Sequence, residues 1–124
     1  MLGEHSDTIA TYRNGDISNF SINGKLKYSD ISSPETDLVQ LEIGTGVTCI
    51  SAETFKNMSW LSCVTIPKTV DKISNAAFKS CSDLEVLAID NGITAIGRDA
   101  FNSCTKLEHV NIPASVESIG VNAF

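Results

Sequence analysis

The sequence predicts a right-handed solenoid, a β-rich member of the α/β class, with a parallel sheet on its concave face. Three observations predict it: a 23-residue period, alternating apolar residues within each period, and prolines placed where a strand would end. The period runs without insertions through an aromatic column, Phe55, Phe78, Phe101 and Phe124. Chance composition would not keep this spacing.

Five further apolar columns share the interval, and one unit cannot bury them by itself. Stability is therefore expected to come from stacked coils, in which each column becomes a continuous internal ladder. The columns are Val47, Val70, Ile93 and Val116; Ile50, Ile73, Ile96 and Ile119; Leu41, Val64, Leu87 and Val110; Ile43, Ile66, Ile89 and Ile112; and Leu61, Leu84 and Leu107.

Each unit begins with a short predicted strand. Leu107, Val110 and Ile112 carry the spacing that turns alternate side chains inward. Pro67 and Pro113 follow the strands of their units, and proline ends a strand because it has no N–H to donate to a continuing ladder.

The rest of the unit contains a second extended piece and a turn. The extended piece carries Val116 and Ile119 and is followed by a glycine, Gly97 or Gly120, where we expect the chain to turn tightly. The stretch Asn75–Cys81 begins a row of apolar residues three apart, which predicts a short helical turn.

The period fails upstream of Val39. Residues 1–38 are therefore expected to form an N-terminal tail, a cap and a connecting loop, and residues 39–124 to form the repeats. The last unit stops part-way at Phe124, so we expect the chain to be a piece of a longer protein.

An Asn-Gly pair at positions 23–24 predicts a hairpin. A two-residue loop would put Phe20 and Ile22 on the face opposite Leu26 and Tyr28. A three-residue loop pairs Ile22 with Leu26 and Phe20 with Tyr28, which makes one apolar face. We expect this second arrangement, a β-hairpin that caps the open end of the solenoid.

The repeated pattern LxxVxIPxxVxxIGxxAFxxCxx resembles the BspA-like class of leucine-rich repeats. The resemblance covers Leu41 to Phe124 and implies a leucine-rich-repeat solenoid. It also implies a surface-exposed or secreted protein in which the array mediates adhesion to host or matrix proteins, or between cells. Most departures from the pattern lie in the first coil, where atypical residues are expected because that coil is terminal. They are Gly44, Ser51, Thr54 and Met58, and Ser74 and Asp90 are later substitutions.

Composition excludes several classes of function. A net charge of −6 with nine scattered Lys and Arg residues does not suit a phosphate backbone, so a nucleic-acid partner is not expected. No apolar run approaches the roughly 18 to 20 residues that cross a bilayer, so we expect no direct membrane insertion. Residues 1–14 lack the basic start and apolar region of a signal peptide.

The four cysteines do not predict a metal centre. Cys81 and Cys104 share one column and are interpreted as buried thiols, although adjacent coils would also bring them close enough for a disulfide. Cys49 and Cys63 fall in outward positions, and no CxxC or HxxxH spacing suggests zinc. We expect neither a metal nor another cofactor.

Catalysis is not expected either. The only histidines are His5, near the N-terminus, and His109, on the outer face of a strand, and neither has an evident nucleophile or carboxylate partner. Carboxylates are dispersed, and no glycine-rich phosphate loop is present. The sequence therefore predicts a protein that is not an enzyme.

The strand phase predicts a ladder of outward residues as the partner-binding candidate. Its centre is apolar and its ends are polar, as in a contact patch. Isolated apolar surface residues are also ordinary, so both interpretations remain. The ladder consists of Gln40, Glu42, Cys63, Thr65, Val86, Ala88, His109 and Asn111.

Trp60 is a second binding candidate. Its column holds Asp83 and Lys106 in the other coils, which predicts that Trp60 faces solvent. An exposed tryptophan is typical of a binding hot spot. The ring could equally pack on the cap loop.

The predicted function is a non-catalytic protein-interaction module in a larger adhesin-like protein, at the cell surface or secreted as the resemblance implies. Its partner would be a host, matrix or cell-surface protein. The alternative is a structural spacer that holds an anchor or effector domain. Self-association is a third hypothesis, because the apolar columns are uncovered at Phe124.

Overall fold

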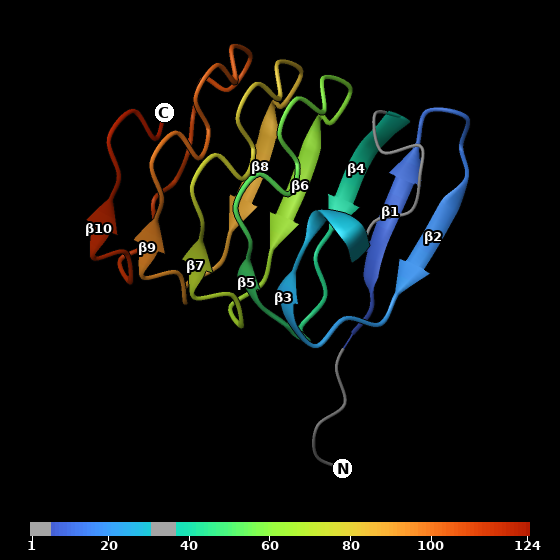
Figure 1. The fold of residues 1–124 in the computed structure, drawn as a ribbon, viewed down its shortest axis with the longest axis horizontal. Helices are drawn as coiled ribbons and strands as arrows, with labels where there is room; N and C mark the ends of the chain where they lie inside the picture. The colour runs from blue at the N-terminus through green and yellow to red at the C-terminus, as the bar shows by residue number, and fades with distance from the viewer. Residues whose placement is uncertain (1–5, 31–36) are drawn as a thin grey trace.

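The computed structural model describes residues 6–30 and 37–124, which wind as a solenoid of stacked coils (Figure 1). Two five-stranded sheets run along it, which confirms the predicted solenoid with a parallel sheet. The strands are β1 (Thr8–Tyr12), β2 (Ile17–Phe20), β3 (Gly24–Leu26), β4 (Leu38–Glu42), β5 (Val47–Ile50), β6 (Cys63–Ile66), β7 (Lys72–Ile73), β8 (Val86–Ile89), β9 (Ala95–Ile96) and β10 (Ser118–Ile119), and a 3-10 turn, η1, spans Tyr28–Asp30.

The first sheet has the strand order β2-β1-β4-β6-β8. Its three repeat strands are parallel, and Leu41 pairs with Val64, which pairs with Leu87. The pairing therefore keeps the 23-residue period and sets each member of an apolar column beside the next.

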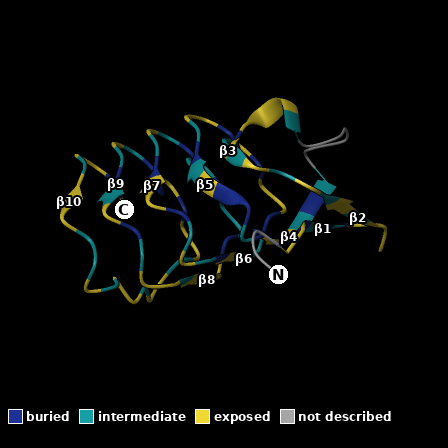
Figure 2. Ribbon diagram, turned by 90° about the horizontal axis from the view of Figure 1, so that it is seen from below, coloured by how far each residue is buried: buried dark blue, intermediate teal, exposed yellow. Residues whose placement is uncertain are grey.

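The second sheet has the order β10-β9-β7-β5-β3, and all its pairs are parallel. The two sheets lie on opposite sides of the coils, and the apolar columns fill the space between them (Figure 2). Burial decreases toward the C-terminal end, where both residues of β10 are exposed.

The aromatic column runs along the core. The rings of Phe55, Phe78, Phe101 and Phe124 stack with centroid separations of 5.0, 5.2 and 5.2 Å. This interval is close to the roughly 4.8 Å between neighbouring strands, so the rings follow the stacking of the coils. Phe78 is fully buried, whereas Phe124 is 51% exposed at the end of the stack.

The stretch Asn75–Cys81 is a series of tight turns and not the predicted helical turn. Ala76 and Ser80 have φ values of 57° and 63°, which interrupt a right-handed helix. The Phe78 N–H donates to the Ala100 carbonyl of the next coil at 2.8 Å instead of to a residue one helical turn back. Hydrogen bonding between coils replaces hydrogen bonding within a helix.

An N-terminal hairpin is present, but β1 and β2 form it. Thr8 pairs with Phe20 in antiparallel register. Strand β1 also pairs antiparallel with β4, so the hairpin covers the N-terminal edge of the first sheet. The predicted pairing of Phe20 with Tyr28 is wrong, and Tyr28 is 52% exposed.

The predicted pairing of Ile22 with Leu26 is wrong as well. Strand β3, which contains Leu26, joins the second sheet and pairs in parallel with β5. The register shifts by one residue between Gly24 and Lys25. This shift breaks the 23-residue spacing, which is why periodicity does not detect this strand.

Gly44 stands in the column of Pro67 and Pro113, at the point where the N-terminal segment crosses the first coil. A Cβ at Gly44 would lie 2.2 Å from the Ser6 carbonyl oxygen. The Ser6 N–H donates to Thr45 Oγ1 at 2.8 Å, which holds the crossing in place.

Gly97 and Gly120 each begin a tight turn, as predicted, because the Ala100 N–H donates to the Gly97 carbonyl at 3.3 Å and the Ala123 N–H donates to the Gly120 carbonyl at 3.2 Å. The turn itself does not require glycine. Neither has a positive φ. A Cβ at Gly120 would lie 2.5 Å from the backbone nitrogen of Arg98, in the preceding coil. The repeat therefore needs glycine here so that neighbouring backbones can touch.

Candidate functional site

The outward residues of the first sheet form two rows across its repeat strands. The pairing of β4, β6 and β8 aligns Gln40, Cys63 and Val86 in one row and Glu42, Thr65 and Ala88 in the other. His109 and Asn111 lie one period further along and are exposed outside any strand. We call these eight residues the outer face.

The outer face is open to solvent along its length. Only Cys63 among its residues is half-buried, and the others are exposed. Val86, the first residue of β8, is 53% exposed although its strand pairs with β6. The structure therefore brings together the residues of the predicted ladder on one surface.

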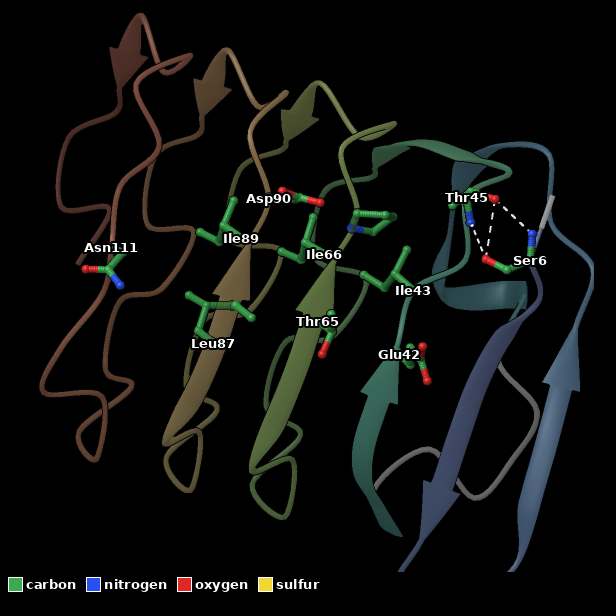
Figure 3. Close-up of a pocket in the computed structure, with 12 residues that line it drawn as sticks. Ser6, Glu42, Ile43, Thr45, Thr65, Ile66, Leu87, Ile89, Asp90 and Asn111 are labelled. Carbon is green, nitrogen blue, oxygen red and sulfur yellow. Dashed lines mark hydrogen bonds between the residues drawn. The ribbon is translucent and has the colours of Figure 1, made fainter.

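A depression of about 500 Å³ adjoins the second row (Figure 3). It lies at the carboxyl ends of β4, β6 and β8, where Glu42, Thr65 and Ala88 line it. Two carboxylates, those of Glu42 and Asp90, belong to its lining, and none of its lining residues is basic.

Apolar side chains complete the wall of the depression. Ile43 and Ile66 are buried there, and Leu87 and Ile89 are half-buried. Sequence reasoning did not place these residues in a site, because their columns predict only core positions. The sequence does distinguish Asp90, because it stands at the position where Pro67 and Pro113 end the strands of their units.

Trp60 lies just before β6, at the end of that strand opposite to the depression. The ring is 44% exposed. The Arg13 guanidinium carbon lies 3.9 Å from the ring centroid, and Arg13 also pairs with Asp37 at 3.6 Å. Trp60 is therefore exposed as predicted, and it also packs on the residue that follows β1.

The thiols of Cys81 and Cys104 are buried and free, as the column predicts. The Cys81 thiol donates to the Phe55 carbonyl at 3.1 Å, and the Cys104 thiol donates to the Phe78 carbonyl at 3.2 Å. Burial raises the pKa of Cys81 to about 12, with a further contribution from Cys104, and burial raises the pKa of Cys104 to about 11. Both thiols therefore stay protonated and inert.

The remaining chemistry-bearing residues are dispersed. Cys49 is half-buried, with its Sγ 3.8 Å from Ser74 Oγ, and His5 lies outside the described residues. Within residues 6–30 and 37–124, no group of three or more His, Cys, Asp or Glu side chains could hold a metal ion. In the same residues, no helix is long and apolar enough to span a membrane.

The family model of the BspA type leucine rich repeat region matches residues 10–124 in six copies. The chain belongs to the BspA-type leucine-rich repeat family. This BspA-type match begins within β1, so it includes residues upstream of the regular 23-residue period. A search of curated proteins finds no match.

Solved leucine-rich repeat structures share the fold of this BspA-type chain. The T. pallidum leucine-rich repeat protein has a TM-score of 0.73 and 26% identity, over 80% of this chain and 46% of that one. The Bacteroides ovatus protein has a TM-score of 0.62 and 24% identity, over 97% and 31% of the two chains. The Bacteroides capillosus protein has the same TM-score and identity, over 95% and 86%. The chain thus spans less than half the length of the first two.

Proposed function

We propose that this array is a non-catalytic protein-interaction module whose partner contacts the outer face. The observation that carries the proposal is Val86, a large apolar side chain that is 53% exposed beside Cys63, with polar residues at both ends of the outer face. Exposed apolar residues with a polar rim are the usual anatomy of a contact patch. Solenoids also present extended surfaces because each coil adds residues to the same face.

The partner would be a host, matrix or cell-surface protein, and the module would belong to a larger adhesin-like protein at the cell surface or in secreted form. Family resemblance supports this part of the proposal. A structural spacer is the alternative, in which the outer face contacts nothing.

Capture experiments test the proposal. The immobilised chain is exposed to extracellular-matrix and cell-surface protein preparations, alongside a Val86→Asp variant. An aspartate at the centre of the contact would be buried without a partner, so we expect a loss of binding of about tenfold or more. Thr48→Asp, at an exposed position on the second sheet, is the matched control.

Two results would speak for the spacer. One is that the unsubstituted chain captures no protein. The other is that Val86→Asp and Thr48→Asp bind equally well.

Self-association is a second candidate, favoured by exposed apolar side chains at the C-terminal end of the stack. Light scattering is expected to show a mass that rises with concentration, and a constant monomer mass would contradict it. The side chains are Ile112, Ile119, Val121 and Phe124, between 40% and 68% exposed.

A further inference from the structure

We propose that the depression at the carboxyl ends of β4, β6 and β8 receives a basic side chain, lysine or arginine, of the protein partner. The inference rests on the proposed function and specifies the chemistry by which the outer face selects its partner. Four outer-face residues line the depression: Glu42, Thr65, Ala88 and Asn111. A partner seated on the outer face would therefore cover it.

The charges of the depression favour a cation. Glu42 and Asp90 are its only charged lining residues. Asp90 Oδ1 accepts from the Asn91 N–H at 3.0 Å. Among the described residues, nothing pairs with the other Asp90 oxygen or with the Glu42 carboxylate. Lys68 follows the lining residue Pro67 in the sequence and is exposed, but it does not line the depression.

The apolar part of the lining favours a cation with an aliphatic stem. Leu87 and Ile89 are half-buried and Ala88 is exposed, so apolar surface adjoins Asp90 in the lining. Lysine and arginine pack their methylene groups on apolar surface and keep the charged head at polar groups. The volume of about 500 Å³ also leaves room for residues that flank the basic one.

Other ligands fit less well. A bare metal ion would need at least three ligand side chains together, and the described residues offer no such group. An anion would meet two carboxylates and no basic residue. The net charge of −6 attracts any cation over distance, so the test must separate local recognition from this general attraction.

The test is a nuclear magnetic resonance titration of the ¹⁵N-labelled full chain. The probes are three capped pentapeptides that differ only in the central residue, which is lysine, norleucine or glutamate. We expect the lysine peptide to shift the amides of Thr65, Ala88 and Asp90 selectively. Norleucine keeps the stem without the charge, so its peptide is expected to bind at least about tenfold more weakly.

Substitutions locate the charge effect. Glu42→Gln and Asp90→Asn each remove one charge, and an asparagine at position 90 retains the Oδ1 acceptor for Asn91. Either is expected to weaken the lysine peptide about tenfold. Glu117→Gln, at an exposed position outside the depression, makes the same change in net charge and is expected to have little effect.

The inference is overturned if the shifts spread over the whole surface, if no shifts occur, or if Glu117→Gln weakens binding as much as Glu42→Gln. Its failure is distinguishable from failure of the proposed function. If Val86→Asp abolishes capture while Glu42→Gln leaves the lysine peptide unaffected, the outer face binds protein by other chemistry. If instead the lysine peptide binds at the depression but Val86→Asp does not change capture of the partner, the depression is selective for a basic side chain and the proposed outer-face contact is wrong.

Discussion

At the residue scale, the cysteine column links burial to hydrogen bonding between coils. Cys81 and Cys104 each donate to a phenylalanine carbonyl 26 residues earlier. Spacing predicts that the column is buried and apolar, and burial is what the structure shows. The thiol hydrogen bonds could not be predicted, because they depend on where the preceding coil places its carbonyl groups.

Thiol reactivity checks this arrangement. At about pH 8, a thiol with a raised pKa is almost entirely protonated, and the thiolate is the nucleophile. We expect a disulfide reagent such as Ellman's to modify the half-buried Cys49 and Cys63 in the folded chain. Cys81 and Cys104, whose pKa values rise to about 12 and about 11, should react only after unfolding.

The control is a Cys81→Ala, Cys104→Ala double variant, which should keep the fast reaction unchanged and lose the reaction that needs denaturant. Rapid modification of Cys81 or Cys104 in the folded chain would show that the column is not closed to solvent.

At the element scale, sequence reasoning succeeds where elements repeat and fails where they do not. The repeat strands follow from a period that both sheets preserve, as in the pairing of Val64 with Leu87 and of Ile73 with Ile96. The hairpin of β1 and β2 has no period, and β3 is shifted by one residue. The Asn-Gly pair at 23–24 predicts a hairpin turn, but the residues from Gly24 to Leu26 pair with β5 instead of with the preceding segment.

Gly44 offers a test of the N-terminal crossing. Alanine at this position would place a Cβ 2.2 Å from the Ser6 carbonyl oxygen, so the segment or the first coil must move. We expect Gly44→Ala to lower the free energy of unfolding by about 1–3 kcal/mol, as other overpacked sites do. Chemical denaturation followed by circular dichroism measures it.

A chain that starts at Thr8 provides the control, because it lacks the backbone that the new Cβ would meet. There Gly44→Ala is expected to cost much less. An equal cost in both chains would mean that the crossing is not what requires glycine.

At the scale of the whole molecule, the binding candidates arise from stacking and not from any one coil. The period and the strand phase predicted the rows of the outer face, because each row takes one residue from each strand. The depression could not be predicted, since it depends on the chain path after each strand and on Ser6, which comes from the N-terminal crossing. Among the lining residues, Asp90 departs from the repeat pattern, because it stands in place of a proline.

The most direct measurement is hydroxyl-radical footprinting of the chain with and without a captured partner. If the outer face is the contact, the partner lowers oxidation of Cys63, Val86 and His109 and leaves Tyr28, which is 52% exposed in η1, unchanged. Unchanged oxidation of the outer face, with protection elsewhere on the solenoid, would contradict the proposed mode of binding.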